Sequence, residues 1–332
     1  MKRRDFMSLL GGIAAMPMYS PLLARAQQPG KMRHVGVLQG GLARGDAGGQ
    51  AEAAAFEDGL KELGWKPGVT IDLDYHWPGA ELDAVRTAAN AIAATRPDVV
   101  VSRSTPATSA MIDSGVPLVF VLVVDPIGSR FVQNFAHPGG NVTGFSSFEG
   151  SVGGKWLELL KEASPTLSQV AILFNPETAP FAEEFLESAQ TAAKTLRATV
   201  IAAPCHNTAE IESAFAARAH ATGGGIIAIT DTFLTEHHDL INELATRYRL
   251  PVISGGRVFV LSGGLIAYAV DFADIYRRAA GYVDRILHGT RPGELPVQEP
   301  AKFTLSINLK AARAIGLTLP QTLVAQADEV IE

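Results

Sequence analysis

The sequence predicts an α/β protein built from two doubly wound, Rossmann-like lobes, each around a mostly parallel β-sheet. Short all-apolar runs alternate with segments of helical periodicity, which is the pattern of βαβ units. The alternation begins a second time near the middle of the chain. The 332 residues are 47% hydrophobic and 19% charged, which supplies a large core and excludes a disordered chain or a coiled coil.

The first half of the chain reads as an alternation of strands and helices over residues 34–124. Val99–Val101 is entirely apolar, as expected for a parallel strand covered on both faces. Residues 51–63 place apolar side chains at helical spacing, and Gly64 ends that helix. The expected strands are 34–38, 71–75, 99–101 and 118–124, and the expected helices are 51–63, 81–94 and 105–114.

The second half repeats this order after residue 170 and then adds a short tail. The expected strands are 170–174, 199–202, 226–229, 251–253, 265–270 and 303–307, and the expected helices are 181–196, 211–221, 235–249, 275–287 and 309–315. The elements after residue 265 are too few for a third domain. They are expected to complete the two lobes, so the chain crosses between the lobes more than once.

Residues 1–26 have the organisation of a secretory signal peptide. A basic start with the pair Arg3-Arg4 precedes an apolar stretch, and Ala24-Arg25-Ala26 follows as a small-x-small cleavage pattern. We expect cleavage after Ala26 and a periplasmic product, with the twin-arginine and general secretion routes both open. The segment holds four basic residues and one acidic one, so the net charge of the remaining chain is −9 rather than −6. No later stretch is apolar enough to span a membrane.

Charge and motifs argue against a nucleic-acid binder and against an enzyme. A negative net charge repels phosphates, and the chain contains neither a P-loop nor a G-x-S-x-G elbow. The glycine-rich run 223–228 precedes its strand, so it is read as a turn rather than a nucleotide site. Neighbouring His237 and His238 point in different directions on a helix, and the lone Cys205 is read as a packing residue. We therefore expect no catalytic residue, no cofactor and no metal.

Small polar residues gather where the predicted strands end. Ligands bind outside the carboxyl ends of the strands in open α/β sheets, and hydroxyl, amide and glycine residues suit a small polar ligand. Ser104, Thr105 and Ser146 are candidates to hold a carboxylate, and Asp231 or Asp271 could face an ammonium group or cap a helix. The predicted ligand-binding residues are Gly40, Gly41, Ser104, Thr105, Asp125, Ser146, Asn175, Asp231, Thr232, Ser254 and Asp271.

Several stretches together resemble one known family, the solute-binding proteins of ABC transporters with the type I periplasmic binding fold. The stretches are Val124–Gly128, Pro138–Gly144, Lys155–Lys161, Gly263–Leu265 with Asp271-Phe272, and Ile307–Lys310 through to Ala327–Ile331. The resemblance covers nearly the whole chain after the signal. Within the family, the chain is most similar to the branch that includes tryptophan and tyrosine binders.

This resemblance implies two lobes joined by a multi-strand hinge. It places hinge residues at Gly144, Phe145 and Val270, and a third crossing near 296–300. The expected domains are the signal peptide at 1–26, lobe 1 at 31–144 plus 270–298, and lobe 2 at 145–269 plus 299–332.

The resemblance also implies a function. We expect a periplasmic component of an ABC importer that captures a small polar solute. The solute would be an amino acid or an organic acid, and aromatic solutes are included. It would deliver the solute to an inner-membrane permease, act as a monomer, and neither span the membrane nor bind nucleic acid. A ligand-sensing receptor subunit and an exported α/β enzyme are the alternatives that the sequence leaves open.

Overall fold

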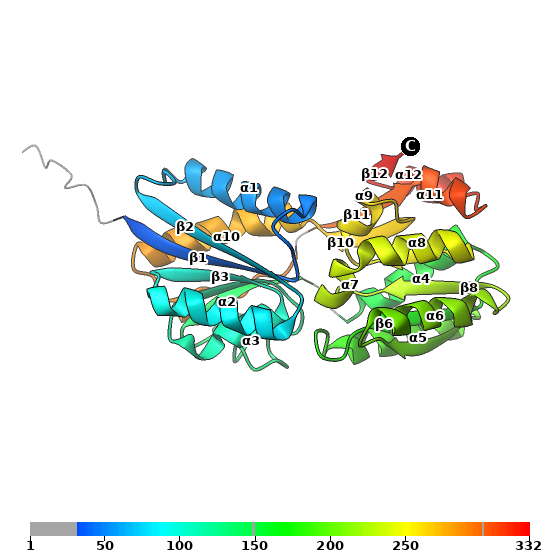
Figure 1. The fold of residues 1–332 in the computed structure, drawn as a ribbon, viewed down its shortest axis with the longest axis horizontal. Coiled ribbons are helices and arrows are strands. Elements are labelled where there is room, and N and C mark those ends of the chain that lie inside the picture. The colour runs from blue at the N-terminus through cyan, green and yellow to red at the C-terminus, as the bar shows by residue number, and fades with distance from the viewer. Residues whose placement is uncertain (1–31, 148–149, 301) are drawn as a thin grey trace, which may run out of the picture. The chain divides into compact units, whose positions relative to one another are not determined.

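Two β-sheets organise the described part of the chain (Figure 1). The structure is a computed structural model that describes residues 32–147, 150–300 and 302–332. The predicted signal peptide and its cleavage site lie outside these described residues.

The first sheet consists of five parallel strands in the order β2-β1-β3-β4-β5. This is a doubly wound order, in which the chain starts in the sheet interior and winds outward in both directions. The predicted fold class is therefore confirmed for this half. The strands are β1 (Arg33–Gly40), β2 (Ile71–Gly79), β3 (Val99–Arg103), β4 (Leu118–Val123) and β5 (Val142–Ser146).

The second sheet repeats that order and then extends it. Its strands run β12-β11-β10-β9-β8-β6-β7, so β7-β6-β8-β9-β10 has the same winding as the first sheet. All its pairings are parallel except that of β10 with β11. The strands are β6 (Gln169–Phe174), β7 (Thr199–Pro204), β8 (Gly224–Ala228), β9 (Val252–Ser254), β10 (Ile266–Val270), β11 (Phe303–Asn308) and β12 (Glu329–Ile331).

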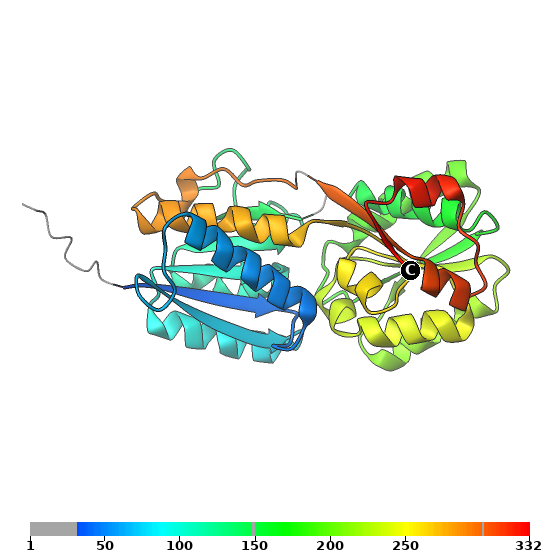
Figure 2. The ribbon, with the colours of Figure 1, turned by 90° about the horizontal axis from the view of Figure 1, so that it is seen from above.

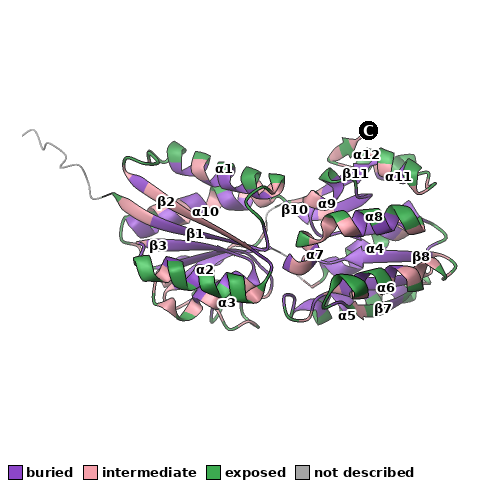
Figure 3. Cartoon of the chain, viewed as in Figure 1, coloured by how far each residue is buried: buried purple, intermediate pink, exposed green. Residues whose placement is uncertain are grey.

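Helices cover both faces of each sheet and enclose the apolar core (Figures 1 and 3). In the first sheet α1 and α10 lie side by side on one face, as Figure 2 shows from above, and α2 and α3 cover the other. The β3 and β4 strands are buried along their whole length, as their all-apolar runs predict. The helices are α1 (Ala47–Glu62), α2 (Leu82–Thr95), α3 (Thr105–Met111), α4 (Val152–Ala163), α5 (Ala182–Leu196), α6 (Thr208–Ala219), α7 (Thr232–Glu236), α8 (His238–Tyr248), α9 (Arg257–Leu261), α10 (Phe272–Leu287), α11 (Leu309–Ala314) and α12 (Gln321–Gln326).

Three connections join the elements of the two sheets. The chain leaves the first sheet after β5, returns between β10 and α10, and leaves again between Gln298 and β11. Two of them meet side by side, because Phe145 forms a bridge with Gln298. The backbone N–H of Gln298 donates to the carbonyl oxygen of Gly144 at 2.9 Å.

Several elements were not predicted from the sequence, namely β5, α4, α9, α12 and β12. Tertiary packing explains two of them. In β5, a Cβ on Gly144 would lie 2.1 Å from the backbone oxygen of Phe120, so a weak strand former is required there by the close approach of β4. In α4, a Cβ on Gly153 would lie 2.1 Å from the backbone oxygen of Phe185, so this glycine lets α4 pack tightly on α5.

The prediction of one helix over residues 235–249 was wrong in its extent. The structure has two helices there, α7 and α8, which meet at His237. No helix of residues 32–147, 150–300 and 302–332 is long and apolar enough to cross a membrane.

Candidate functional site

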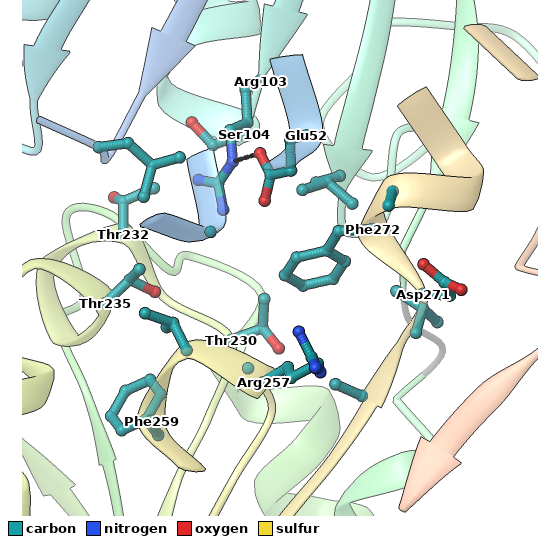
Figure 4. A pocket seen from close by; sticks show the side chains of 18 of the residues that line it. Glu52, Arg103, Ser104, Thr230, Thr232, Thr235, Arg257, Phe259, Asp271 and Phe272 are labelled. Carbon is teal, nitrogen blue, oxygen red and sulfur yellow. Dashed lines mark hydrogen bonds and ion pairs between the residues drawn. The ribbon is translucent and has the colours of Figure 1, made fainter. Parts of the chain in front are cut away.

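A cavity of about 520 Å³ lies where the carboxyl ends of strands from both sheets face each other. Residues after β3 and β4 of the first sheet line it together with residues after β8, β9 and β10 of the second. Parallel strands place such loops at one edge, so the position is the one that the fold favours for a ligand. Figure 4 shows side chains of residues that line it.

Five predicted ligand-binding residues line the cavity. They come from both sheets and include three hydroxyl and two acidic side chains. These residues are Ser104, Thr105, Asp231, Thr232 and Asp271. The predicted hinge residue Val270 lies beside them in the cavity wall.

The other six predicted residues are outside the cavity lining, and the structure places them as follows. Gly40 accepts a hydrogen bond from Arg103 through its carbonyl oxygen, and Gly41 packs against Thr232. The Asp125 carboxylate accepts a hydrogen bond from the backbone N–H of Gly128 at 2.8 Å, and this bond closes a turn.

The remaining three form hydrogen bonds with backbone groups, and for Ser146 the partner is distant in the sequence. Ser146 donates to the carbonyl oxygen of Gln298 through its backbone N–H at 2.9 Å. The Asn175 side chain accepts from the backbone N–H of Glu177, and the Ser254 hydroxyl donates to the carbonyl oxygen of Gly256 at 3.1 Å. These contacts stabilise turns and strand ends outside the cavity lining.

Three hydroxyl groups in the cavity wall are buried and lack a hydrogen-bond partner among the described residues. They are the hydroxyls of Ser104, Thr105 and Thr232, whose residues are 5%, 7% and 7% exposed. A buried hydroxyl without a partner costs free energy, so such groups mark a place where a ligand or water completes the hydrogen bonds. Ser104 also has a φ of 80°, a strained backbone conformation for a residue with a side chain.

An ion pair that the sequence analysis did not identify forms one wall. Arg103, at the end of β3, contacts Glu52 of α1 with Nε and Oε2 2.9 Å apart, and both side chains are more than nine-tenths buried. Burial raises the pKa of Glu52, and the neighbouring Arg103 opposes that rise. The guanidinium also lies over the ring of Phe272 at 5.9 Å (Figure 4). Topology alone brings these groups together, because Arg103 and Glu52 are 51 positions apart.

The two acidic residues proposed to face an ammonium group both cap helices. Asp231 accepts from the backbone N–H groups of Asn175 and Phe233 at 2.5 and 2.8 Å, and from the hydroxyl of Thr178. Burial raises the pKa of Asp231 to about 6 in spite of these hydrogen bonds. Asp271 accepts from the backbone N–H of Asp274 at the start of α10 and remains exposed.

The lining combines apolar walls with an excess of acidic groups. Its apolar part includes three phenylalanines, Phe181, Phe259 and Phe272. Its ionisable groups comprise six acids and three bases, of which Arg257 forms a two-fold contact with Glu329 at 2.6 and 2.8 Å. The acids are Asp46, Glu52, Asp231, Asp271, Asp328 and Glu329, and the bases are Arg103, Arg257 and Lys302.

Cys205 lies apart from this lining and is buried in the core of the second sheet. Burial raises the pKa of its thiol to about 12, so the side chain stays protonated and packs as a small apolar group.

The model of the family described as "ABC transporter substrate binding protein" matches residues 45–331. The chain belongs to this family. The family predicted from the sequence motifs is thus confirmed, and the branch is supported by the relatives that follow.

Three comparisons describe what this substrate-binding protein is similar to. A protein of Clostridioides difficile named tyrosine-binding protein is 22% identical over 79% of this chain and 75% of its own length. A conserved domain protein of Vibrio cholerae has the same fold, with a TM-score of 0.82 and 28% identity over 90% of this chain and all of that one. The domain from Streptococcus pneumonia solved in complex with L-Trp has a TM-score of 0.81 and 24% identity, again over 90% of this chain and all of that one.

Proposed function

We propose that this substrate-binding protein captures a zwitterionic amino acid with an apolar or aromatic side chain in the cavity between its two sheets. It then presents the solute to an inner-membrane ABC permease from the periplasm, as the signal peptide predicts. Gly144, Phe145 and Val270, on the connections between the sheets, act as the hinge about which lobes 1 and 2 close. The observation that carries the proposal is a cavity lined both by phenylalanine side chains and by three buried hydroxyls that have no hydrogen-bond partner among the residues that the structure describes.

The polar and apolar walls correspond to the two ends of such a solute. The hydroxyls of Ser104, Thr105 and Thr232 can donate to a carboxylate without filling the space around it. The phenylalanine side chains offer the apolar contact that an aromatic or branched side chain requires. The names of two relatives, one a tyrosine binder and one solved with L-Trp, agree with this assignment.

Charge favours an amino acid over an organic acid. The lining carries three more acids than bases, so a solute with only carboxylates is repelled by the cavity as a whole. An ammonium group on the solute offsets that repulsion. Asp231 is occupied by its helix-capping hydrogen bonds and Glu52 by its ion pair with Arg103, so we assign the contact with the ammonium group to the exposed Asp271.

The test is a calorimetric titration with L-tryptophan, L-tyrosine and two truncated analogues. Indole-3-propionate lacks the ammonium group and tryptamine lacks the carboxylate. We expect each analogue to bind at least about 10-fold more weakly than L-tryptophan, because each loses charge-assisted hydrogen bonds worth about 1.5–3 kcal/mol. Indole-3-propionate binding as tightly as L-tryptophan would contradict the proposal.

A substitution tests the carboxylate contact from the protein side. Thr105→Val keeps the shape of the side chain and removes its hydroxyl, so we expect a loss of affinity of about 10-fold or more with little change in Tm. Thr87→Val is the matched control, because Thr87 is an exposed residue of α2 whose hydroxyl bonds only within its helix. Equal affinity of the two variants would show that Thr105 does not hold the solute.

A further inference from the structure

The short helix α7 lies between the second sheet and two loops of the first. Its start is held by Asp231, which caps it and also binds the backbone N–H of Asn175 and the hydroxyl of Thr178. Its end is separated from α8 at His237, whose ring nitrogen Nδ1 is 2.8 Å from the carbonyl oxygen of Phe233. The helix is therefore fixed to the second half at its start and is followed directly by α8 at its end.

The first residue of α7 contacts the loop after β1. A Cβ on Gly41 would lie 2.6 Å from the Cγ2 methyl of Thr232, so the bare backbone of this glycine touches the threonine directly. Gly41 has a φ of 82° and donates its backbone N–H to the carbonyl oxygen of Gly79 at 2.8 Å. The loops after β1 and β2 are thus joined behind this contact.

The last residue of α7 contacts the loop after β2. The backbone N–H of Ala80 donates to Oε2 of Glu236 at 3.3 Å, across 156 positions of sequence. A Cβ on Gly79 would lie 3.0 Å from the other carboxylate oxygen of Glu236, so a larger residue would crowd it. Glu236 is not among the residues that line the cavity.

We propose that α7 is a latch between the lobes, and that Glu236 and Gly41 set the affinity for the solute without touching it. The inference rests on the proposed function, because it assumes that the lobes close on a solute. The contact of Gly41 with Thr232 and that of Ala80 with Glu236 exist only while the two sheets are together. The latch therefore stabilises the closed arrangement in the presence and in the absence of solute.

The contact affects the affinity for the solute through the fraction of the free protein that is closed. For a solute that binds only the closed form, the apparent dissociation constant equals the dissociation constant of the closed form divided by the closed fraction of the free protein. Removal of the Glu236 acceptor lowers that fraction, so binding weakens while the cavity itself is unchanged. A hydrogen bond to a partly exposed carboxylate corresponds to about a 5-fold change.

The test compares Glu236→Ala with Glu236→Gln and with Glu212→Ala. Glutamine keeps an acceptor oxygen for the Ala80 N–H, and Glu212 is an exposed residue of α6 that gives the same change in charge. L-tryptophan and L-tyrosine serve as probes. We expect Glu236→Ala to bind the better of them about 5-fold more weakly, mainly through faster dissociation, and the other two variants to stay within about 2-fold of the wild type. The Tm of all four proteins without solute should agree.

A second readout does not depend on the identity of the solute. Dyes on cysteines introduced at the exposed Asp83 of α2 and Glu187 of α5 report the distance between the lobes by energy transfer, while the buried Cys205 stays unlabelled. We expect Glu236→Ala to lower the closed fraction of the solute-free protein relative to Glu212→Ala.

The outcomes separate the latch from the proposed function. Absence of binding by the wild type to either amino acid contradicts the proposed solute, and the latch is then judged by energy transfer alone. Equal energy transfer in Glu236→Ala and Glu212→Ala, or equal affinity where a probe binds, would overturn the latch.

Discussion

At the scale of single residues, the buried pair of Arg103 and Glu52 shows how stability and binding share one position. Both side chains are more than nine-tenths buried, so each depends on the charge of the other, and the Arg103 guanidinium also donates to the carbonyl oxygen of Gly40. The pair also presents the guanidinium above Phe272 at the cavity wall. An apolar pair could fill the same space but could not offer charge to a solute.

This dependence gives a prediction for substitutions of the pair. Arg103→Met leaves the Glu52 carboxylate buried without its partner and should lower the free energy of unfolding by about 3–5 kcal/mol. The double variant Glu52→Met/Arg103→Met should recover most of that loss, since both charges are removed together. Urea unfolding measures the stability of each variant, and calorimetry measures whether the double variant has lost the solute. A double variant no more stable than Arg103→Met would contradict this account.

At the scale of elements, the capping carboxylate of Asp231 makes the attachment of α7 dependent on pH. Burial raises the pKa of Asp231 from an ordinary 3.8 to about 6. A raised pKa means that the folded protein holds this proton more tightly than the unfolded chain. The stability that the group contributes is therefore complete below about pH 4 and is lost as the pH rises through about 6.

The corresponding prediction compares the wild type with Asp231→Asn, which does not titrate. The difference in free energy of unfolding between them should change by up to about 3 kcal/mol between pH 4 and pH 7, with the wild type losing stability relative to the variant as pH rises. Urea unfolding at intervals of half a pH unit measures this difference. A difference that stays constant over the range would show that Asp231 titrates alike in both states.

Elements that depend on local pattern were predictable, and those that depend on distant contacts were not. The strands at 99–101 and 118–124 were predicted because continuous apolar runs need no partner to be recognised. The start of α7 at Thr232 depends on the hydrogen-bond partners of Asp231, which periodicity cannot register. β5 contains Gly144 because of the backbone of β4, so its sequence alone is weak evidence for a strand.

The residues of the candidate site divide in the same way, into those that a local pattern predicts and those that depend on distant contacts. Ser104, Thr105, Asp231, Thr232 and Asp271 follow strands directly, so the rule that ligands lie at the carboxyl ends of strands found them. Glu52 is on a helix and faces the cavity only because the start of α1 lies beside Arg103 at the end of β3. Gly41 also follows a strand, but it packs behind Thr232 of the lining and is not itself part of the lining.

At the scale of the whole molecule, the two sheets have the same winding order and supply different groups to one cavity. The first sheet contributes Ser104, Thr105 and Arg103, and the second contributes Thr232 and Phe259. A solute that contacts both sets must leave before either half unfolds. Binding should therefore couple the stabilities of the two halves more strongly than the apolar cluster that they share does alone.

This coupling leads to a prediction for thermal unfolding. At about 100 times its dissociation constant a solute adds about 2.7 kcal/mol to the free energy of unfolding. Because the proposed site takes groups from both halves, every calorimetric transition should move to higher temperature when L-tryptophan is present, and two transitions seen without it should draw together. Thr105→Val, at the same solute concentration, should show smaller shifts in proportion to its weaker binding. A shift confined to one transition would mean that only one half holds the solute, and the cavity between the sheets would not be the site.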